Sequence, residues 1–518
     1  MPRPCRTGQI NPLYAAAFGS LALLGVIALL MLNGVGGPVS RTSRAKRLTV
    51  YCAAGLRPAV EAIAKEYEAH HDVNIQLEYG GSNTLLSRLE VAGMGDLYLA
   101  ADQSYTDLAR KKGLVRETIS LAVMRPVILV GKGNPKNIHS IDDLLRPGVR
   151  VALGNPQQAA IGKKTKRLLE QSGHWKRLEK QVEDHGVFKP TVPEIANDVK
   201  LGSVDASIVW DAVAARYTDL QAIRTPELDA GQSRITVGVV TASKHPTAAL
   251  KFARYLAARD KGSKIFAEKG YDAIKGDPWA ERPKMTFFVG SVNRRALEPI
   301  LKAFTEREGI EINTVYNGCG ILTAQMRAMK ADQASGFPDA YMACDVYYLN
   351  TVSDLFQRGV NISHTDIVIV VQKGNPKHLE SLADLTKPGV RVALGQPDQC
   401  TIGVLSRHLL ESEGIYQKLL DQNVVTQTAT SALLVPSVAT GSADAALAYR
   451  TDTLAEHEKV DAVAIQSPLA KAVQPYSIAL SSPYKQLAGR LYAAIAAGRE
   501  SFESAGFTWQ LDSPAKTD

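Results

Sequence analysis

The sequence predicts an α/β protein made of two copies of one domain behind an N-terminal membrane segment. Three observations predict it: an uncharged apolar run near the N-terminus, four sequence motifs that recur far downstream, and short apolar strands alternating with helices in each copy. At 518 residues the chain is too long for one hydrophobic core. Its 45% hydrophobic and 22% charged residues are typical of a folded globular protein.

The first 47 residues form a segment of their own. No charged residue lies between Arg6 and Arg41, and residues 13–32 (LYAAAFGSLALLGVIALLML) are about long enough to cross a bilayer as a helix. The run is longer than a usual signal-peptide core, which favours an uncleaved anchor over a cleaved signal. We therefore expect residues 1–47 to be a cytoplasmic stub, a transmembrane helix and a linker. The body would then lie in the periplasm or outside the cell, tethered to the inner membrane.

The net charge of +8 does not predict nucleic-acid binding. Six of the basic residues lie in the first 47 positions, which contain no acid: Arg3, Arg6, Arg41, Arg44, Lys46 and Arg47. The remaining body therefore carries only about two positive charges, too few for such a surface.

The internal repeat predicts a tandem duplication. Four motifs recur in the same order at a nearly constant spacing of about 240 residues. The pairs are LTVYCAAGLRPAVEAI at Leu48 with MTFFVGSVNRRALEPI at Met285, KGNPKNI at Lys132 with KGNPKHL at Lys373, RVALGNPQQAAIG at Arg150 with RVALGQPDQCTIG at Arg391, and GSVDASIVW at Gly202 with GSADAALAY at Gly441. We expect domains over 48–275 and 284–510, joined by the polar, proline-containing GDPWAERP.

Each copy alternates strands and helices, which predicts parallel sheets. In the first copy the apolar run 121–130, interrupted by Pro126, suits a strand that passes between lobes. The helix over 57–70 has Pro58 near its start and one apolar face. The other expected elements are strands over 48–52, 73–79, 96–101, 150–154, 206–210 and 235–241, and helices over 83–91 and 246–257.

The candidate binding residues lie where strands end and helices begin, because ligands of open α/β sheets bind outside the carboxyl ends of the strands. The stretch 79–85 (YGGSNTL) is a glycine turn that leads through Ser82 into a helix. Its free N–H groups and hydroxyl are suited to a small anion. The twin stretch 316–322 (YNGCGIL) carries Cys319 in place of the serine.

Six motifs of the first copy follow one another in a set order: AAGL, YGGSNTL, GDLYLAAD, VALGNP…IG, DASIVW and ALKFARYLAARDKGSKIFAEKGY. Together they resemble the periplasmic molybdate-binding proteins of ABC importers. The resemblance covers nearly all of 48–275 and, more weakly, 284–510. It implies two α/β lobes per domain that close on the ligand by a hinge, a tetrahedral oxyanion held by hydroxyls and N–H groups, an ABC permease as partner, no cofactor and no catalysis.

The resemblance also assigns binding residues. In the first copy Ser82, followed by Asn83, matches one ligand serine, and the second serine falls on Gly55 without a hydroxyl. The first copy thus has the positions Gly55, Ser82, Asn83, Ile161, Val192 and Trp210, where Ile161 and Val192 are backbone donors and Trp210 replaces a tyrosine. The second copy has Val292, Cys319, Ile402, Ser431 and Tyr449.

Structural roles are the alternatives for these residues. Ser82 also fits a helix N-cap, and Trp210 and Tyr449 also fit core aromatics. Asp102 and Asp345, which follow the third strand of each copy, are expected to be N-caps.

Three of the five cysteines, Cys319, Cys344 and Cys400, are expected around the second cleft. They fit buried small residues, a disulfide such as Cys319 to Cys400 with Cys344 free, or a three-thiolate site for Cu(I) or Zn(II). The last two options give an alternative function, a soft-metal or redox-sensing binding protein. The sequence contains no HExxH, Walker or GxSxG motif, so none of these motifs predicts an enzyme.

Overall fold

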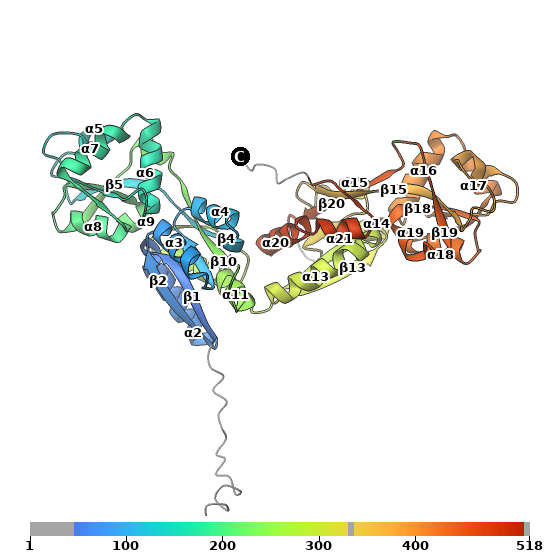
Figure 1. The fold of residues 1–518 in the computed structure, drawn as a ribbon, viewed down its shortest axis with the longest axis horizontal. Helices are drawn as coiled ribbons and strands as arrows, with labels where there is room; N and C mark the ends of the chain where they lie inside the picture. The colour runs from blue at the N-terminus through green and yellow to red at the C-terminus, as the bar shows by residue number, and fades with distance from the viewer. Residues whose placement is uncertain (1–45, 330–335, 512–518) are drawn as a thin grey trace, which may run out of the picture. The chain divides into compact units, whose positions relative to one another are not determined.

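The computed structural model describes residues 46–329 and 336–511, which form two copies of one α/β architecture (Figure 1). Within these ranges no helix has the length and apolar character needed to cross a membrane. The expected anchor at residues 13–32 lies outside the described residues. Each copy has its own hydrophobic core, one drawn from residues 48–271 and the other from residues 285–507.

The first lobe of the first repeat is a six-stranded sheet in the order β11-β4-β10-β3-β1-β2. Its strands are β1 (Lys46–Ala53), β2 (Val73–Gly80), β3 (Leu97–Ala100), β4 (Val115–Met124), β10 (Ser233–Val240) and β11 (Asp272–Ala273). Its helices are η1 (Ala54–Leu56), α2 (Arg57–His70), α3 (Ser82–Ala92), α4 (Gln103–Lys111), α11 (Pro246–Ala257) and α12 (Gly262–Glu268).

Helix α2 buries the apolar face that its sequence predicts, with Val60, Ile63 and Tyr67 in the core. The expected parallel sheet is mixed, because β1 runs parallel to β3 whereas β10 is antiparallel to β3. The reason is that β10 brings the chain back from the second lobe, so it enters the sheet from the opposite end.

The second lobe is a five-stranded sheet in the order β7-β6-β8-β5-β9. Its strands are β5 (Pro126–Gly131), β6 (Val151–Gly154), β7 (Val187–Lys189), β8 (Ala206–Trp210) and β9 (Leu220–Ile223). Its helices are α5 (Ile141–Leu144), α6 (Ala160–Gln171), α7 (Trp175–His185), α8 (Val192–Lys200), α9 (Asp211–Ala214) and α10 (Pro226–Asp229). All residues of β6 and β8 are buried, so these two strands lie in the core of the lobe.

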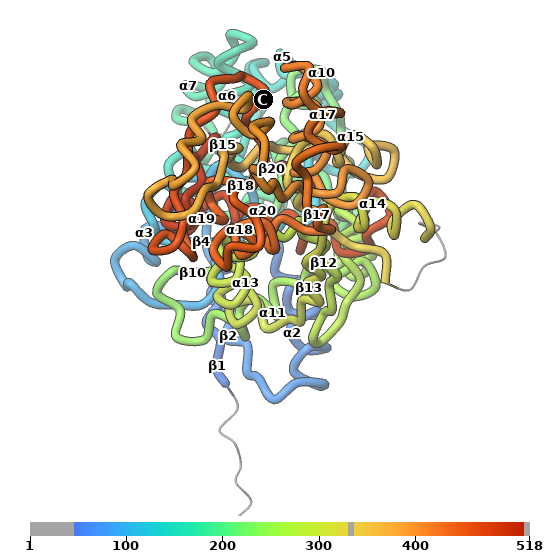
Figure 2. The backbone as a smooth tube through the Cα atoms, turned by 90° about the vertical axis from the view of Figure 1, so that its right-hand side faces the viewer, coloured from blue at the N-terminus to red at the C-terminus, as the bar shows by residue number. Residues whose placement is uncertain are grey.

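The second repeat follows the same order of strands, but its two lobes share one sheet, ordered β13-β12-β14-β20-β15-β18-β16-β17. Its strands are β12 (Lys284–Gly290), β13 (Glu311–Asn317), β14 (Ala340–Met342), β15 (Val360–Gln372), β16 (Val392–Gly395), β17 (Val424–Thr428), β18 (Ala445–Tyr449), β19 (Val460–Ala464), β20 (Lys471–Ile478) and β21 (Thr508–Trp509). Its helices are η2 (Ser291–Asn293), α13 (Arg294–Glu308), α14 (Cys319–Ala328), α15 (Val346–Asn350), η3 (Leu382–Thr386), α16 (Thr401–Ser412), α17 (Tyr416–Gln422), η4 (Ser431–Leu433), α18 (Leu434–Ala439), α19 (Arg450–Thr453), η5 (Leu454–Glu456), α20 (Lys485–Ala496) and α21 (Arg499–Ser504). The trace in Figure 2 can be followed from β1 in blue to α20 in red.

One proline explains the difference between the repeats in their crossing strand. In the first repeat the crossing run is split into β4 and β5 at Arg125, just before Pro126. Pro126 pairs with Trp210 in the first repeat, and its counterpart Ile367 pairs with Tyr449 in the second. Around Ile367, strand β15 continues unbroken for 13 residues. Because proline has no N–H to donate, the strand is interrupted only where proline stands.

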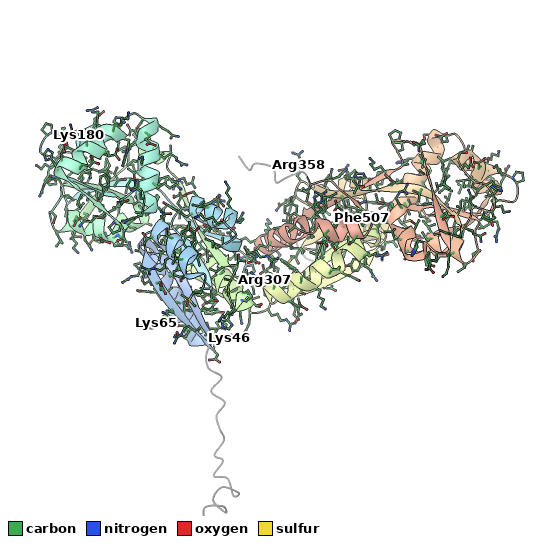
Figure 3. All side chains as sticks on the ribbon, viewed as in Figure 1. Lys46, Lys65, Lys180, Arg307, Arg358 and Phe507 are labelled. Atoms are coloured by element: carbon green, nitrogen blue, oxygen red, sulfur yellow. The ribbon has the colours of Figure 1, made fainter. Side chains whose placement is uncertain are left out.

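The C-terminal end of the second repeat is closed by aromatic packing. The rings of Phe502 and Phe507 are 5.6 Å apart between centroids, and the Phe502 and Trp509 centroids are 5.5 Å apart. Phe507 is labelled in Figure 3. This packing holds β21 against β15, where His364 pairs with Thr508.

Candidate functional site

A small pocket lies between the two lobes of the first repeat. The first lobe contributes the turns after β1, β2 and β3, and the second lobe contributes the starts of α6 and α8 and the end of β8. No acidic side chain lines this pocket. The lining residues are Ala53, Ala54, Gly55, Gly80, Gly81, Ser82, Ala101, Ala159, Ala160, Pro190, Thr191, Val192 and Trp210.

Three helices begin at this pocket, and none of them is capped by a side chain. Helix α3 begins at Ser82, α6 at Ala160 and α8 at Val192, and no side chain of their N-cap residues accepts a hydrogen bond from a backbone N–H of the helix. The N-cap hydroxyl of α8, on Thr191, donates instead to the Glu194 carboxylate in the first turn. The first N–H groups of a helix have no partner within the helix, and the helix dipole makes this end positive. The three ends together give the pocket a positive potential without a charged side chain, which suits a small anion.

Ser82 faces this pocket rather than capping α3. Gly81 occupies the N-cap position, and Ser82 is the first helical residue, with 1% of its surface exposed. The Ala101 N–H donates a hydrogen bond of 3.2 Å to Ser82 Oγ, which leaves the hydroxyl hydrogen available to donate. The N-cap alternative for Ser82 is therefore wrong.

Trp210 is fully buried at the end of β8, and its indole Nε1 has no hydrogen-bond partner among the described residues. A buried N–H without a partner costs free energy unless something binds it. Trp210 and Val213 flank Gly55, where a Cβ would lie 3.6 Å from Val213 Cγ2 and 4.0 Å from Trp210 Cδ1. The position of the missing serine is thus open to a side chain.

Two predicted residues of the first repeat do not line the pocket. The Asn83 N–H donates to the Gln158 carbonyl at 3.1 Å, and Asn83 Nδ2 donates to the Gln157 carbonyl at 2.6 Å. Asn83 therefore connects the two lobes. Ile161 is the second residue of α6 and is buried, whereas its neighbour Ala160 lines the pocket.

Sequence reasoning did not find an ion pair that also joins the lobes. Lys164 Nζ on α6 lies 2.8 Å from Asp102 Oδ2 after β3, and each side chain is 9% exposed. Burial raises the pKa of Asp102, but Lys164 together with Ser104 and Ser233 outweighs burial and lowers the pKa to about 2. The Asp102 side chain also accepts from the Ser104 N–H, so the predicted N-cap is confirmed. In the sequence, only a difference between the repeats indicates the pair. The position of Lys164 is occupied by Leu405 in the second repeat.

The second cleft keeps the backbone arrangement but has different side chains. The predicted residues Val292, Ile402 and Ser431 are buried at the starts of η2, α16 and η4. Tyr449 is 1% exposed, and its hydroxyl has no partner among the described residues. Asp345 accepts from the Tyr347 N–H, as predicted for an N-cap, but burial raises its pKa because no lysine is paired with it.

A carboxyl group stands beside the second cleft. Asp452 occupies the position of Val213, and its Oδ2 is buried without a partner among the described residues. Burial raises the pKa of Asp452 to about 6, although a hydrogen bond with Ser431 opposes the rise. A carboxylate here repels an anion near Ser431, so the second cleft is less suited to an oxyanion than the first.

The cysteines of the second repeat are buried and free, as the first of the three alternatives predicts. The disulfide and the metal site are corrected. The disulfide from Cys319 to Cys400 is not formed, since Cys400 Sγ donates to the carbonyls of Gln396 and Thr428, both at 3.5 Å, while Cys319 Sγ contacts Cys344 Sγ. No group of three or more ligating side chains in 46–329 and 336–511 could hold a metal ion. The expected metal site at Cys319, Cys344 and Cys400 is therefore absent, because Cys400 is engaged with backbone carbonyls instead.

The sequence belongs to a family of binding proteins. The family described as bacterial extracellular solute-binding protein matches residues 48–272 and again 285–508, so the chain belongs to this family and contains it twice. A binding protein from Haemophilus influenzae is 28% identical over 229 residues, covering 44% of this chain and 91% of that protein.

Molybdate-binding proteins are among the relatives. The molybdate-binding protein ModA of Mycobacterium tuberculosis is 26% identical over 257 residues, covering 49% of this chain and 94% of that protein. The solved periplasmic molybdate-binding protein of Azotobacter vinelandii is 14% identical, with a TM-score of 0.38, covering 43% of this chain and 98% of that chain. The expected family is thus confirmed by the sequence matches.

Proposed function

We propose that this protein captures a small oxyanion of the molybdate or tungstate type in the pocket of its first repeat and delivers it to an ABC permease. The observation that carries the proposal is the meeting of three uncapped helix N-termini at a pocket without an acidic residue. The hydroxyl of Ser82 and the unpaired Nε1–H of Trp210 add two side-chain donors. The relatives named molybdate-binding proteins support the same ligand class.

Binding and lobe closure are coupled in this proposal. Donors from α3 lie in one lobe, whereas α6, α8 and Trp210 lie in the other. An anion that accepts hydrogen bonds from both lobes binds the closed state more tightly than the open one and shifts the population toward it. The permease then distinguishes the loaded closed protein from the open one.

We also propose that residues 13–32 anchor the protein in the inner membrane, with the binding domains outside the cytoplasm. The apolar length of this segment and the extracellular family description support this placement. Proteolysis of intact spheroplasts tests it, because the binding domains should be digested while the anchored fragment stays with the membrane. Release of the whole chain by washing without detergent would contradict the anchor.

Thermal unfolding of the purified protein with molybdate, tungstate, sulfate and phosphate tests the ligand class. At a hundredfold excess over the dissociation constant, a bound anion should stabilise the protein by about 2.7 kcal/mol. The variant W210F should lose part of this gain because it lacks the indole N–H, while Y449F, the matched change in the second repeat, should keep it. If none of the four anions raises Tm, the oxyanion proposal fails.

A further inference from the structure

Cys319 and Cys344 form a buried pair of thiols in the second repeat. Their Sγ atoms are 3.0 Å apart, and both residues are at most 5% exposed. Cys319 is the first residue of α14, and Cys344 is the second residue after β14. The Cys344 N–H donates to Cys319 Sγ at 3.2 Å, the same contact that Ala101 N–H makes with Ser82 Oγ in the first repeat.

A glycine beside the pair makes room for the two sulfur atoms. A Cβ at Gly290 would lie 2.2 Å from Cys344 Sγ and 2.7 Å from Cys319 Sγ, which no real side chain tolerates. The first repeat has Ala53 at this position, next to Ser82 and Ala101. Positions 290, 319 and 344 therefore all differ from their counterparts in the first repeat. A site with two sulfur atoms requires these changes together, because the sulfur atoms occupy the space of a side chain at position 290.

The surroundings of Cys319 favour its thiolate. Burial raises the pKa of Cys319, but the neighbouring Cys344 thiol and the Thr401 and Tyr341 hydroxyls outweigh burial and lower the pKa to about 7. Both hydroxyls are buried and have no hydrogen-bond partner among the described residues. The N-terminus of α14, which has no side-chain cap, adds its dipole. Cys344, in contrast, has a raised pKa, because its side-chain contact with Cys319 and its burial both favour the neutral thiol.

We propose that Cys319 and Cys344 are a redox-active dithiol that undergoes exchange with small disulfides. The Cys319 thiolate attacks one sulfur of the small disulfide, the S–S bond breaks, and one thiolate leaves. The Cys344 thiol, after losing its proton, attacks Cys319 Sγ in the mixed disulfide and expels the second thiolate. Two protein thiols are thereby oxidised to one disulfide, one small disulfide is reduced to two thiols, and the released protons go to the leaving thiolates.

The thiols react when the two lobes of the second repeat separate. In the closed state the Ile321 N–H donates to the Gln399 carbonyl at 3.3 Å, and the second lobe covers Gly318 and Gly320. An extracytoplasmic location, where disulfides persist, is consistent with this chemistry. Cys400 takes no part, because its thiol donates to two carbonyls and burial raises its pKa to about 11.

Incubation of the full chain in buffers of reduced and oxidised glutathione tests the proposal. After quenching with an alkylating agent and digestion, peptide mass analysis should find Cys319 joined to Cys344, with Cys400 still alkylated. C344A should instead accumulate glutathione on Cys319, whereas C319S should form neither product. C400S should behave as the wild type does.

Two outcomes would overturn the proposal: Cys319 and Cys344 both remaining thiols in every glutathione buffer, or Cys319 joining Cys400. The variant G290A provides a further check, since its methyl group occupies the space of the sulfur atoms and should prevent the disulfide. The triple variant G290A/C319S/C344A restores the arrangement of the first repeat. If it folds while G290A does not, the loss in G290A is due to the sulfur atoms rather than to the backbone.

Discussion

At the scale of single residues, Gly55 stands where the family resemblance places a second ligand serine. Its neighbours Val213 and Trp210 leave ordinary van der Waals space for a Cβ, and the Gly55 carbonyl is held by a hydrogen bond of 2.6 Å from the Tyr271 hydroxyl. The space for a second hydroxyl donor therefore exists although the hydroxyl does not.

We predict that G55S binds the oxyanion more tightly. A hydrogen bond to a charged group contributes about 1.5 to 3 kcal/mol, so affinity should rise by tenfold or more. Isothermal titration with molybdate measures the change, and G55A is the control that fills the same space without a hydroxyl. Equal affinities of G55S and G55A would show that position 55 does not reach the ligand.

The pair of Asp102 and Lys164 predicts a dependence on acid pH. The folded pKa of Asp102 is lowered to about 2, so the pair stabilises the protein above the unfolded pKa of about 4, and this stability is lost as pH falls toward 2. The two states differ by about two pKa units, which at about 1.4 kcal/mol per unit corresponds to about 2.8 kcal/mol, and most of this is lost by pH 2. Urea unfolding between about pH 5 and pH 2 measures it.

The double variant D102N/K164M is the control, because it lacks both charges and should lose less stability over this pH range. K164M alone should be the least stable at neutral pH, since it leaves a buried carboxylate without its partner. Parallel pH curves for the wild type and the double variant would contradict the role of this pair.

At the scale of elements, the start of α3 is pressed against the other lobe. A Cβ at Gly81 would lie 2.4 Å from the Gln158 carbonyl oxygen and 2.7 Å from the Pro190 carbonyl oxygen, both in the second lobe. The absence of a side chain there is thus a requirement of lobe closure, not of the turn itself, because φ at Gly81 is −67°.

We predict that G81A folds normally but binds the oxyanion at least about tenfold more weakly, because its methyl group keeps the lobes apart. Calorimetric titration gives the affinity, and the Tm without ligand reports folding. G131A is the matched control, since a Cβ there makes only ordinary contacts at 3.8 Å. Unchanged affinity in G81A would mean that binding does not require this closed arrangement.

At the scale of the whole molecule, one architecture carries two different clefts. The first has Ser82, a tryptophan N–H and no acid in its pocket, whereas the second has the Cys319–Cys344 pair and the carboxyl of Asp452. Duplication preserved the helix N-termini in both repeats, and the side chains around them diverged.

We therefore predict that one chain binds one oxyanion, in the first repeat. Titration should give one equivalent per chain; G81A should weaken this site, while G318A, whose Cβ would meet the Gln399 and Ala429 carbonyls in the second repeat, should leave it unchanged. Two equal sites, or loss of binding in G318A alone, would contradict the assignment.

Much of the site could be predicted from the sequence because its residues lie where a strand is followed by a helix along the chain. The turn at Ser82, the helix starts at Ala160 and Val192 and the strand end at Trp210 all lie at strand–helix junctions that the sequence marks. Which of the N–H groups at these junctions stay free could not be predicted, because whether a neighbouring group occupies one of them depends on contacts across the fold. Asn83 illustrates this, since its N–H is taken by Gln158 of the other lobe.

The sequence by itself determined the duplication, the family and the order of strands and helices, because these follow from short-range periodicity and from the recurrence of motifs. Only the tertiary structure decided that Lys164 meets Asp102, that Gly81 touches the opposite lobe, and that Cys319 pairs with Cys344 rather than Cys400. Each of these joins residues from separate elements, and a difference of a few ångströms decides whether the groups interact.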